Sequence, residues 1–157
     1  MKHSLLKILI FTISSLGVTS AWSSYVDSIL TQKTKPSGVL FEIVSDESDL
    51  LGQLLPTLKA DIVKLRKRFP GLPVAIVTHG TEQFALTTKN RSNESRTHAM
   101  VEELVKSDNV DVHVCGTHAE WYGVTPEDFP DYVDVTAAGP AQIDDYEAMD
   151  YEVIVLP

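Results

Sequence analysis

Cysteine is scarce in this sequence, with Cys115 the only one among 157 residues. A single cysteine cannot form a disulfide within the chain, so a disulfide-stapled fold is excluded. The side chain is then either a buried thiol that behaves as a small apolar group, a reactive thiol, a metal ligand, or half of a bridge between chains. Its surroundings decide between these roles.

Basic residues are also few, since 13 Lys and Arg stand against 22 Asp and Glu and give a net charge of −9. Such an acidic chain lacks the positive surface that neutralises phosphates, so we expect no nucleic-acid partner and no docking on anionic lipid. Glycine and proline, at 8 each, are too few for a collagen-like or low-complexity chain. With 43% apolar residues, the composition indicates one globular domain.

The N-terminus has the pattern of a secretory signal peptide. Lys2 and Lys7 accompany an apolar run over residues 5–11, which is shorter than the ~20 residues that a membrane-spanning helix needs. Small residues follow and permit cleavage on either side of Ala21. We therefore expect residues 1–20 to be a signal peptide, the mature chain to begin near Trp22, and the protein to be periplasmic with no membrane attachment after cleavage.

Strand and helix patterns alternate through a single domain over residues 38–157, after a polar lead-in over residues 21–37 that is expected to be flexible. Compact apolar runs predict buried strands, and apolar residues spaced three and four apart predict helices. The expected strands cover residues 38–44, 72–77, 110–115, 132–136 and 151–156, and the expected helices cover residues 51–69, 95–106 and 139–149. This alternation predicts an α/β fold whose mostly parallel five-stranded sheet carries helices on both faces.

Two polar segments follow buried strands at the carboxyl edge of this sheet, where parallel α/β folds place their sites. They are Thr-His-Gly at residues 78–80 and Cys-Gly-Thr-His at residues 115–118. Alternation along the third strand puts Asp111, His113 and Cys115 on one face, opposite three valines. The cysteine also stands where a strand gives way to a helix, so the next main-chain N–H groups can favour its thiolate.

Four segments resemble the DsrE/DsrF-like family: His-Val-Cys-Gly at residues 113–116, Gly-Val-Thr-Pro-Glu-Asp-Phe at residues 123–129, Met-Asp-Tyr-Glu-Val-Ile at residues 149–154 and Val-Ala-Ile-Val-Thr-His-Gly at residues 74–80. The resemblance implies a three-layer α/β/α sandwich with a parallel five-stranded sheet, usually in a homo-oligomer. It also implies that Cys115 carries sulfur as a persulfide, within sulfur relay or sulfur oxidation.

The main functional hypothesis is therefore a thiol-based sulfur carrier or sulfurtransferase without a cofactor. Cys115 would attack a sulfur donor as a thiolate, while His79 or His113 accepts its proton or stabilises the anion. The expected partners are a donor or acceptor protein thiol and further copies of the chain. For either histidine, the alternative is a hydrogen-bonded structural residue beneath the sheet edge.

Two other functions stay open. A periplasmic copper or zinc protein is one of them, because nitrogen and thiolate ligands suit these metals. Its candidate ligands are His79, His113, Cys115 and His118. The other alternative is a non-catalytic assembly subunit in which the cysteine is structural.

Enzyme signatures of other kinds are missing from the sequence, which has no P-loop, no dinucleotide glycine fingerprint and no Gly-x-Ser-x-Gly turn. Among the remaining side chains, His98 is expected to be exposed in a polar helix. Trp121 and Tyr122 are expected to pack the helix after the cysteine, or to line its pocket or an oligomer contact.

Overall fold

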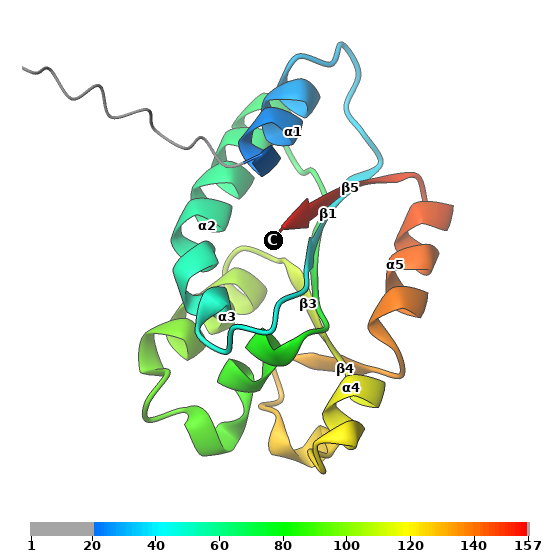
Figure 1. Ribbon diagram of the computed structural model, residues 1–157. Coiled ribbons are helices and arrows are strands. Elements are labelled where there is room, and N and C mark those ends of the chain that lie inside the picture. Colours follow the sequence, from blue (N-terminus) through cyan, green and yellow to red (C-terminus); the bar gives the residue numbers. More distant parts are fainter. Residues whose placement is uncertain (1–20, 157) are drawn as a thin grey trace, which may run out of the picture.

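The computed structural model describes residues 21–156, which form a sheet of five strands surrounded by helices (Figure 1). The strands are β1 (Gly38–Ile43), β2 (Val74–Thr78), β3 (Asp111–Cys115), β4 (Asp134–Thr136) and β5 (Tyr151–Leu156). The α-helices are α1 (Ala21–Leu30), α2 (Leu50–Arg68), α3 (Ser95–Lys106), α4 (Gly116–Trp121) and α5 (Gly139–Ala148), and the 3-10 helices are η1 (Thr81–Leu86), η2 (Thr88–Asn90) and η3 (Pro126–Asp128). No helix within residues 21–156 has the length and apolar character needed to cross a bilayer. The expected signal peptide, residues 1–20, lies outside the described residues.

The strands pair in parallel throughout, in the order β4-β3-β2-β1-β5. Helices α1, α2 and α3 lie on one side of the sheet and α5 lies on the other (Figure 1). This confirms the predicted three-layer α/β/α sandwich, with a sheet that is wholly parallel. Because β2 and β3 are neighbours, the two polar segments that follow them meet at the same edge.

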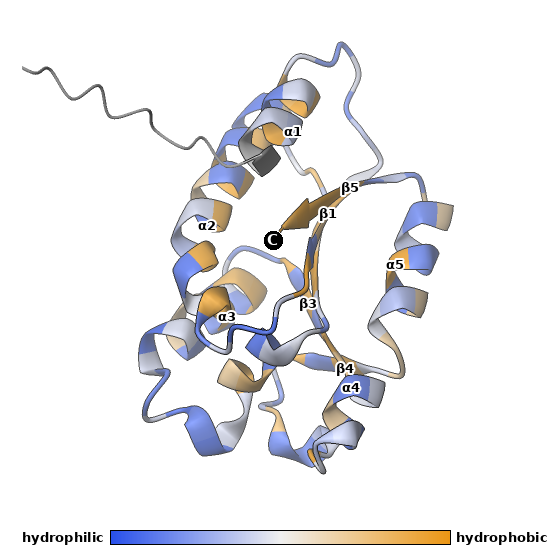
Figure 2. Ribbon diagram, in the orientation of Figure 1, coloured by the Kyte–Doolittle hydropathy of each residue, from blue (hydrophilic) through white to orange (hydrophobic). Residues whose placement is uncertain are grey.

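The two faces of the sheet bury different amounts of apolar surface. The larger core lies between the sheet and helices α1 to α3 and includes Phe41, Leu55 and Leu104, all fully buried. The smaller core, under α5, contains Leu40, Ala75, Val77, Ile143 and Tyr146. Figure 2 shows the strands as mostly apolar and the helices as two-sided. The thinner apolar layer under α5 leaves room for polar side chains at the carboxyl edge of that face.

Helix α1 corrects the expectation of a flexible lead-in over residues 21–37. Val26 and Ile29 of this helix are buried in the larger core, and the helix packs against α2 and β5. The apolar residues with helical spacing are few here, and the residues around them are polar. The local sequence therefore favoured a loose segment. A helix of 10 residues gains its stability from such packing and not from its own propensity.

Candidate functional site

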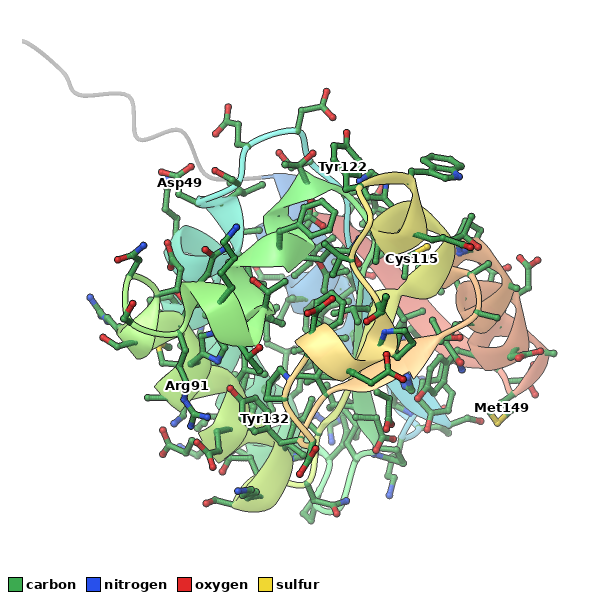
Figure 3. All side chains as sticks on the ribbon, turned by 90° about the horizontal axis from the view of Figure 1, so that it is seen from below. Asp49, Arg91, Cys115, Tyr122, Tyr132 and Met149 are labelled. Carbon is green, nitrogen blue, oxygen red and sulfur yellow. The ribbon has the colours of Figure 1, made fainter. Side chains whose placement is uncertain are left out.

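Cys115 lies at the carboxyl end of β3 and caps the N-terminus of α4. Its Sγ accepts a hydrogen bond from the backbone N–H of His118 at 3.4 Å. Figure 3 shows the residue at the start of α4, with Tyr122 just past the end of that helix. Cys115 is 4% exposed, so only a small reagent, or a movement of the surrounding side chains, gives access to the sulfur.

A glycine is required directly after the cysteine because the chain turns there against its neighbour strand. A Cβ on Gly116 would lie 2.8 Å from the carbonyl oxygen of Thr136. The next amide strengthens the same contact, since the backbone N–H and the hydroxyl of Thr117 both donate to the carbonyl of Ala137, at 3.0 and 2.7 Å. These contacts hold the strand-to-helix turn against the segment that follows β4.

The predicted alternation along β3 is confirmed. Val112 and Val114 belong to the larger core, whereas His113 bonds Tyr146 of α5 on the opposite face. Cys115 shares that face, since its Cβ would lie 3.4 Å from a Cβ built on Gly139, at the start of α5. The cysteine and the histidine of this strand therefore face α5.

His79 and Cys115 both approach Gly139, at the start of α5, through their Cβ atoms. The same Cβ on Gly139 would lie only 2.6 Å from the Cβ of His79, so one glycine separates the two side chains. The imidazole is oriented by Glu42 of β1, whose Oε1 lies 2.9 Å from Nε2. A carboxylate only accepts, so Nε2 carries the proton and Nδ1 is the nitrogen able to take another.

His113 is buried and engaged elsewhere. Its Nε2 lies 2.9 Å from the Tyr146 hydroxyl, and its Nδ1 lies 3.9 Å from Oδ2 of Asp134. Burial lowers the pKa of His113, while the carboxylates of Asp134 and Asp111 oppose that shift. Burial also raises the pKa of Tyr146, so its hydroxyl stays protonated. This geometry matches the structural alternative for His113, and a neutral ring supplies no positive charge to a thiolate.

The four candidate metal ligands do not converge. The ring of His118 stacks on Tyr122 with centroids 5.2 Å apart, His79 bonds Glu42 and His113 bonds Tyr146. Within residues 21–156, no group of three or more His, Cys, Asp or Glu side chains is placed to hold a metal ion. Each of the three candidate histidines thus contacts a different side chain, and the four candidate ligands do not form a metal site.

Two buried residues of η1 support the site and were not singled out from the sequence. Glu82 is fully buried and accepts from the Thr78 hydroxyl at 2.6 Å, from the Gly80 N–H at 2.9 Å and from the Ser45 N–H at 2.8 Å. Gln83 is also fully buried and accepts the Cys115 N–H through Oε1 at 2.8 Å. They lie in a polar stretch with no helical or strand period, so only their position just after the Thr-His-Gly segment hinted at a role.

The expectation that His98 is exposed proves wrong, and that for Trp121 and Tyr122 is corrected in part, since their alternative of an oligomer contact stays a prediction. His98 is 2% exposed, because its ring is covered by Tyr132, whose hydroxyl lies 2.6 Å from Nδ1. Trp121 is 74% exposed and does not pack α4 into the core. Tyr122, 62% exposed, still contacts the rings of His118 and Phe84.

A groove of about 520 Å³ opens beside α4 and runs to the end of β4. Gly116, Thr117, Val135 and Thr136 are among the residues that line it. The cysteine itself is not part of this lining, so the groove borders the site through the residue that follows Cys115.

Solved structures of similar fold match most of the chain. A protein of unknown function, MTH1491 from Methanobacterium thermoautotrophicum, is 16% identical, with a TM-score of 0.57 over 75% of this chain and 97% of that one. The ychN protein from E. coli is 14% identical, with a TM-score of 0.54 over 76% of this chain and 99% of that one. At these identities the likeness establishes the fold alone. No curated protein matches the chain.

A family model matches the part of the chain that carries the cysteine and the two polar segments at the sheet edge. The model of the DsrE/DsrF-like family matches residues 57–156, a range that includes the turn after β2, the cysteine at the end of β3 and the start of α5. Two of the segments that resembled this family in sequence, residues 74–80 and 113–116, end side by side at the carboxyl edge of the sheet, and the chain belongs to the DsrE/DsrF-like family.

Proposed function

We propose that this protein is a thiol-based sulfur carrier, or sulfurtransferase, that holds one sulfur atom on Cys115. The observation that carries the proposal is the position of the sulfur at a strand-to-helix turn, where Sγ already accepts a main-chain N–H at 3.4 Å. A helix N-terminus and an oriented N–H both favour negative charge on a cysteine. Membership of a family linked to sulfur relay agrees with this chemistry.

The proposed reaction is a transfer of sulfane sulfur between thiolates. The Cys115 thiolate attacks the outer sulfur of a persulfide or polysulfide donor, a new S–S bond forms, and the donor's S–S bond breaks. The donor leaves as a thiolate that carries the negative charge, and the proton of the transferred sulfur then passes to that thiolate, which leaves the Cys115 persulfide as an anion. Attack by an acceptor thiolate on that sulfur returns the cysteine to its starting state, so no external oxidant or reductant is consumed.

The experiment that tests this function is intact-mass measurement of the purified protein after brief exposure to polysulfide. A gain of about 32 Da, the mass of one sulfur atom, is expected on Cys115 and should disappear after incubation with an acceptor thiol. A thiol that stays unmodified in the folded protein and reacts only after denaturation contradicts the proposal and favours a structural cysteine.

His79 is proposed to accept the proton of the thiol. Its Cβ and that of Cys115 lie against the same glycine, Gly139, its ring is held by Glu42 through Nε2, and no partner for its Nδ1 is found within residues 21–156. An ordinary thiol is only a few per cent ionised at pH 7, so His79→Gln should slow sulfur loading by at most about thirtyfold at that pH. Intact mass measured on samples quenched at successive times gives the rate of sulfur loading.

The matched control for His79→Gln is His113→Gln, because the new amide can still bond the hydroxyl of Tyr146. His113 is neutral and bonded away from the sulfur, so its replacement should change the loading rate much less. Equal slowing in the two variants would remove His79 from the proposal.

We propose that the protein acts outside the cytoplasm, as the features of residues 1–20 indicate. N-terminal sequencing of the protein from the periplasmic fraction should find a mature chain that begins near Trp22. Recovery of the intact N-terminus from the cytoplasmic fraction contradicts this location. Its proposed partners there are a donor or acceptor protein thiol and further copies of the chain.

A further inference from the structure

The side chain of Gln83 is hydrogen-bonded directly to Cys115, the residue that carries the proposed chemistry. Its Oε1 accepts the backbone N–H of Cys115 at 2.8 Å. A backbone N–H can only donate, so this bond fixes which end of the side-chain amide faces the strand. The Nε2 atom, separated from Oε1 only by the amide carbon, is therefore held near Cys115, and the bond to the strand uses neither of its N–H groups.

The amide nitrogen of Gln83 is buried and unpaired. Within residues 21–156, the buried side-chain nitrogens without a hydrogen-bond partner are those of Gln83, His98 and His118, at Nε2 in each case. Two of these residues are bonded to Cys115, Gln83 through its Oε1 and His118 through its backbone N–H. Unpaired buried donors are uncommon in folded proteins because they are costly, and they call for a ligand or a functional role.

We propose that Gln83 binds the sulfur-loaded form of Cys115, with its amide N–H groups donating to the persulfide anion. This inference rests on the proposed function. The added sulfur extends the side chain by one S–S bond and carries the negative charge at its end, which is the form that needs further donors. The single N–H of His118 already serves Sγ.

A neutral donor suits a carrier better than a cation does. A hydrogen bond to an anion is stronger than one between neutral groups, so the amide retains the persulfide after loading. Because the amide is neutral, no ion pair with the persulfide has to be broken when the sulfur is passed to the acceptor. The same amide anchors the end of β3 through Oε1, and the donor group is thus held at a fixed place relative to the cysteine.

The test is Gln83→Glu, which keeps the size of the side chain and the oxygen that accepts the Cys115 N–H. It replaces the amide donors with an oxygen that only accepts. The loss of a hydrogen bond to a charged group should lower the rate of persulfide formation, or shorten its lifetime, by about tenfold or more. Intact mass after polysulfide exposure gives both quantities. Gln53→Glu makes the same charge change at an exposed position of α2 and should behave as the unaltered protein does.

A measurement on the unaltered protein keeps the test valid if Gln83→Glu does not fold. The side-chain N–H resonances of Gln83 should shift when the protein is loaded with sulfur, whereas those of Gln53 should not. A persulfide that forms and persists equally in Gln83→Glu, or resonances that do not move on loading, overturns this inference alone. Failure of the unaltered protein to form any persulfide overturns the proposed function, and this inference with it.

Discussion

Replacing Cys115 with serine is expected to abolish sulfur loading completely while leaving the free energy of unfolding almost unchanged. The hydroxyl cannot form a persulfide, and Cys115 is the only cysteine in the chain, so no second thiol can substitute. The hydroxyl can still accept the His118 N–H that Sγ accepts now, because serine is among the preferred N-cap residues. Intact mass after polysulfide exposure measures loading, and urea denaturation followed by circular dichroism measures stability.

Cys115→Ala is the matched control for the capping argument. Alanine loses the sulfur and the cap together, so it should also lose all sulfur loading but unfold more easily, by about 0.5–2 kcal/mol. A mass gain of one sulfur atom on Cys115→Ser would place the sulfur on another group and exclude the cysteine as carrier. A serine variant that unfolds as easily as the alanine variant would show that the hydrogen bond to the sulfur position adds no stability.

Several elements of the fold were predictable because their signals are local. The apolar run at residues 151–156 and the helical spacing at residues 95–106 give β5 and α3 with the expected bounds. Alternation along β3 assigned His113 and Cys115 to the same face, and the fold bears this out through Tyr146 and Gly139 of α5. Strand alternation is a property of the backbone and does not depend on what packs above it.

Partners across the fold were not predictable from local sequence. Sharing a face with Cys115 did not bring the ring of His113 to the sulfur, because Tyr146 lies 33 positions along the chain and captures its Nε2. Glu42 is an interior position of an apolar strand, and nothing near it in sequence indicates that it orients His79. Gln83 lies 32 positions before the cysteine whose N–H it accepts. Each of these contacts joins segments that are far apart in the sequence and that only the packed fold brings together.

The turn after β2 depends on one buried carboxylate, and Glu82→Ala is expected to lower the free energy of unfolding by about 3–5 kcal/mol. The alanine leaves the Thr78 hydroxyl and the N–H groups of Gly80 and Ser45 without the acceptors that they have now. Small domains are stable by only about 5–15 kcal/mol, so a loss of this size removes a large part of the total. Urea denaturation gives the value directly.

Two further variants distinguish the stability that comes from the hydrogen bonds of Glu82 from the stability that comes from its charge. Glu82→Gln keeps one accepting oxygen and replaces the other with a donor, so it should cost about 1–3 kcal/mol, less than the alanine variant. Glu103→Ala removes an exposed carboxylate that pairs with Lys59 at 2.5 Å, and an exposed pair of this kind is worth about 1 kcal/mol or less. If Glu82→Ala costs no more than Glu103→Ala, the carboxylate does not hold the turn. Gln83, the next residue of η1, would then owe its position to packing of η1 against α2 and α3.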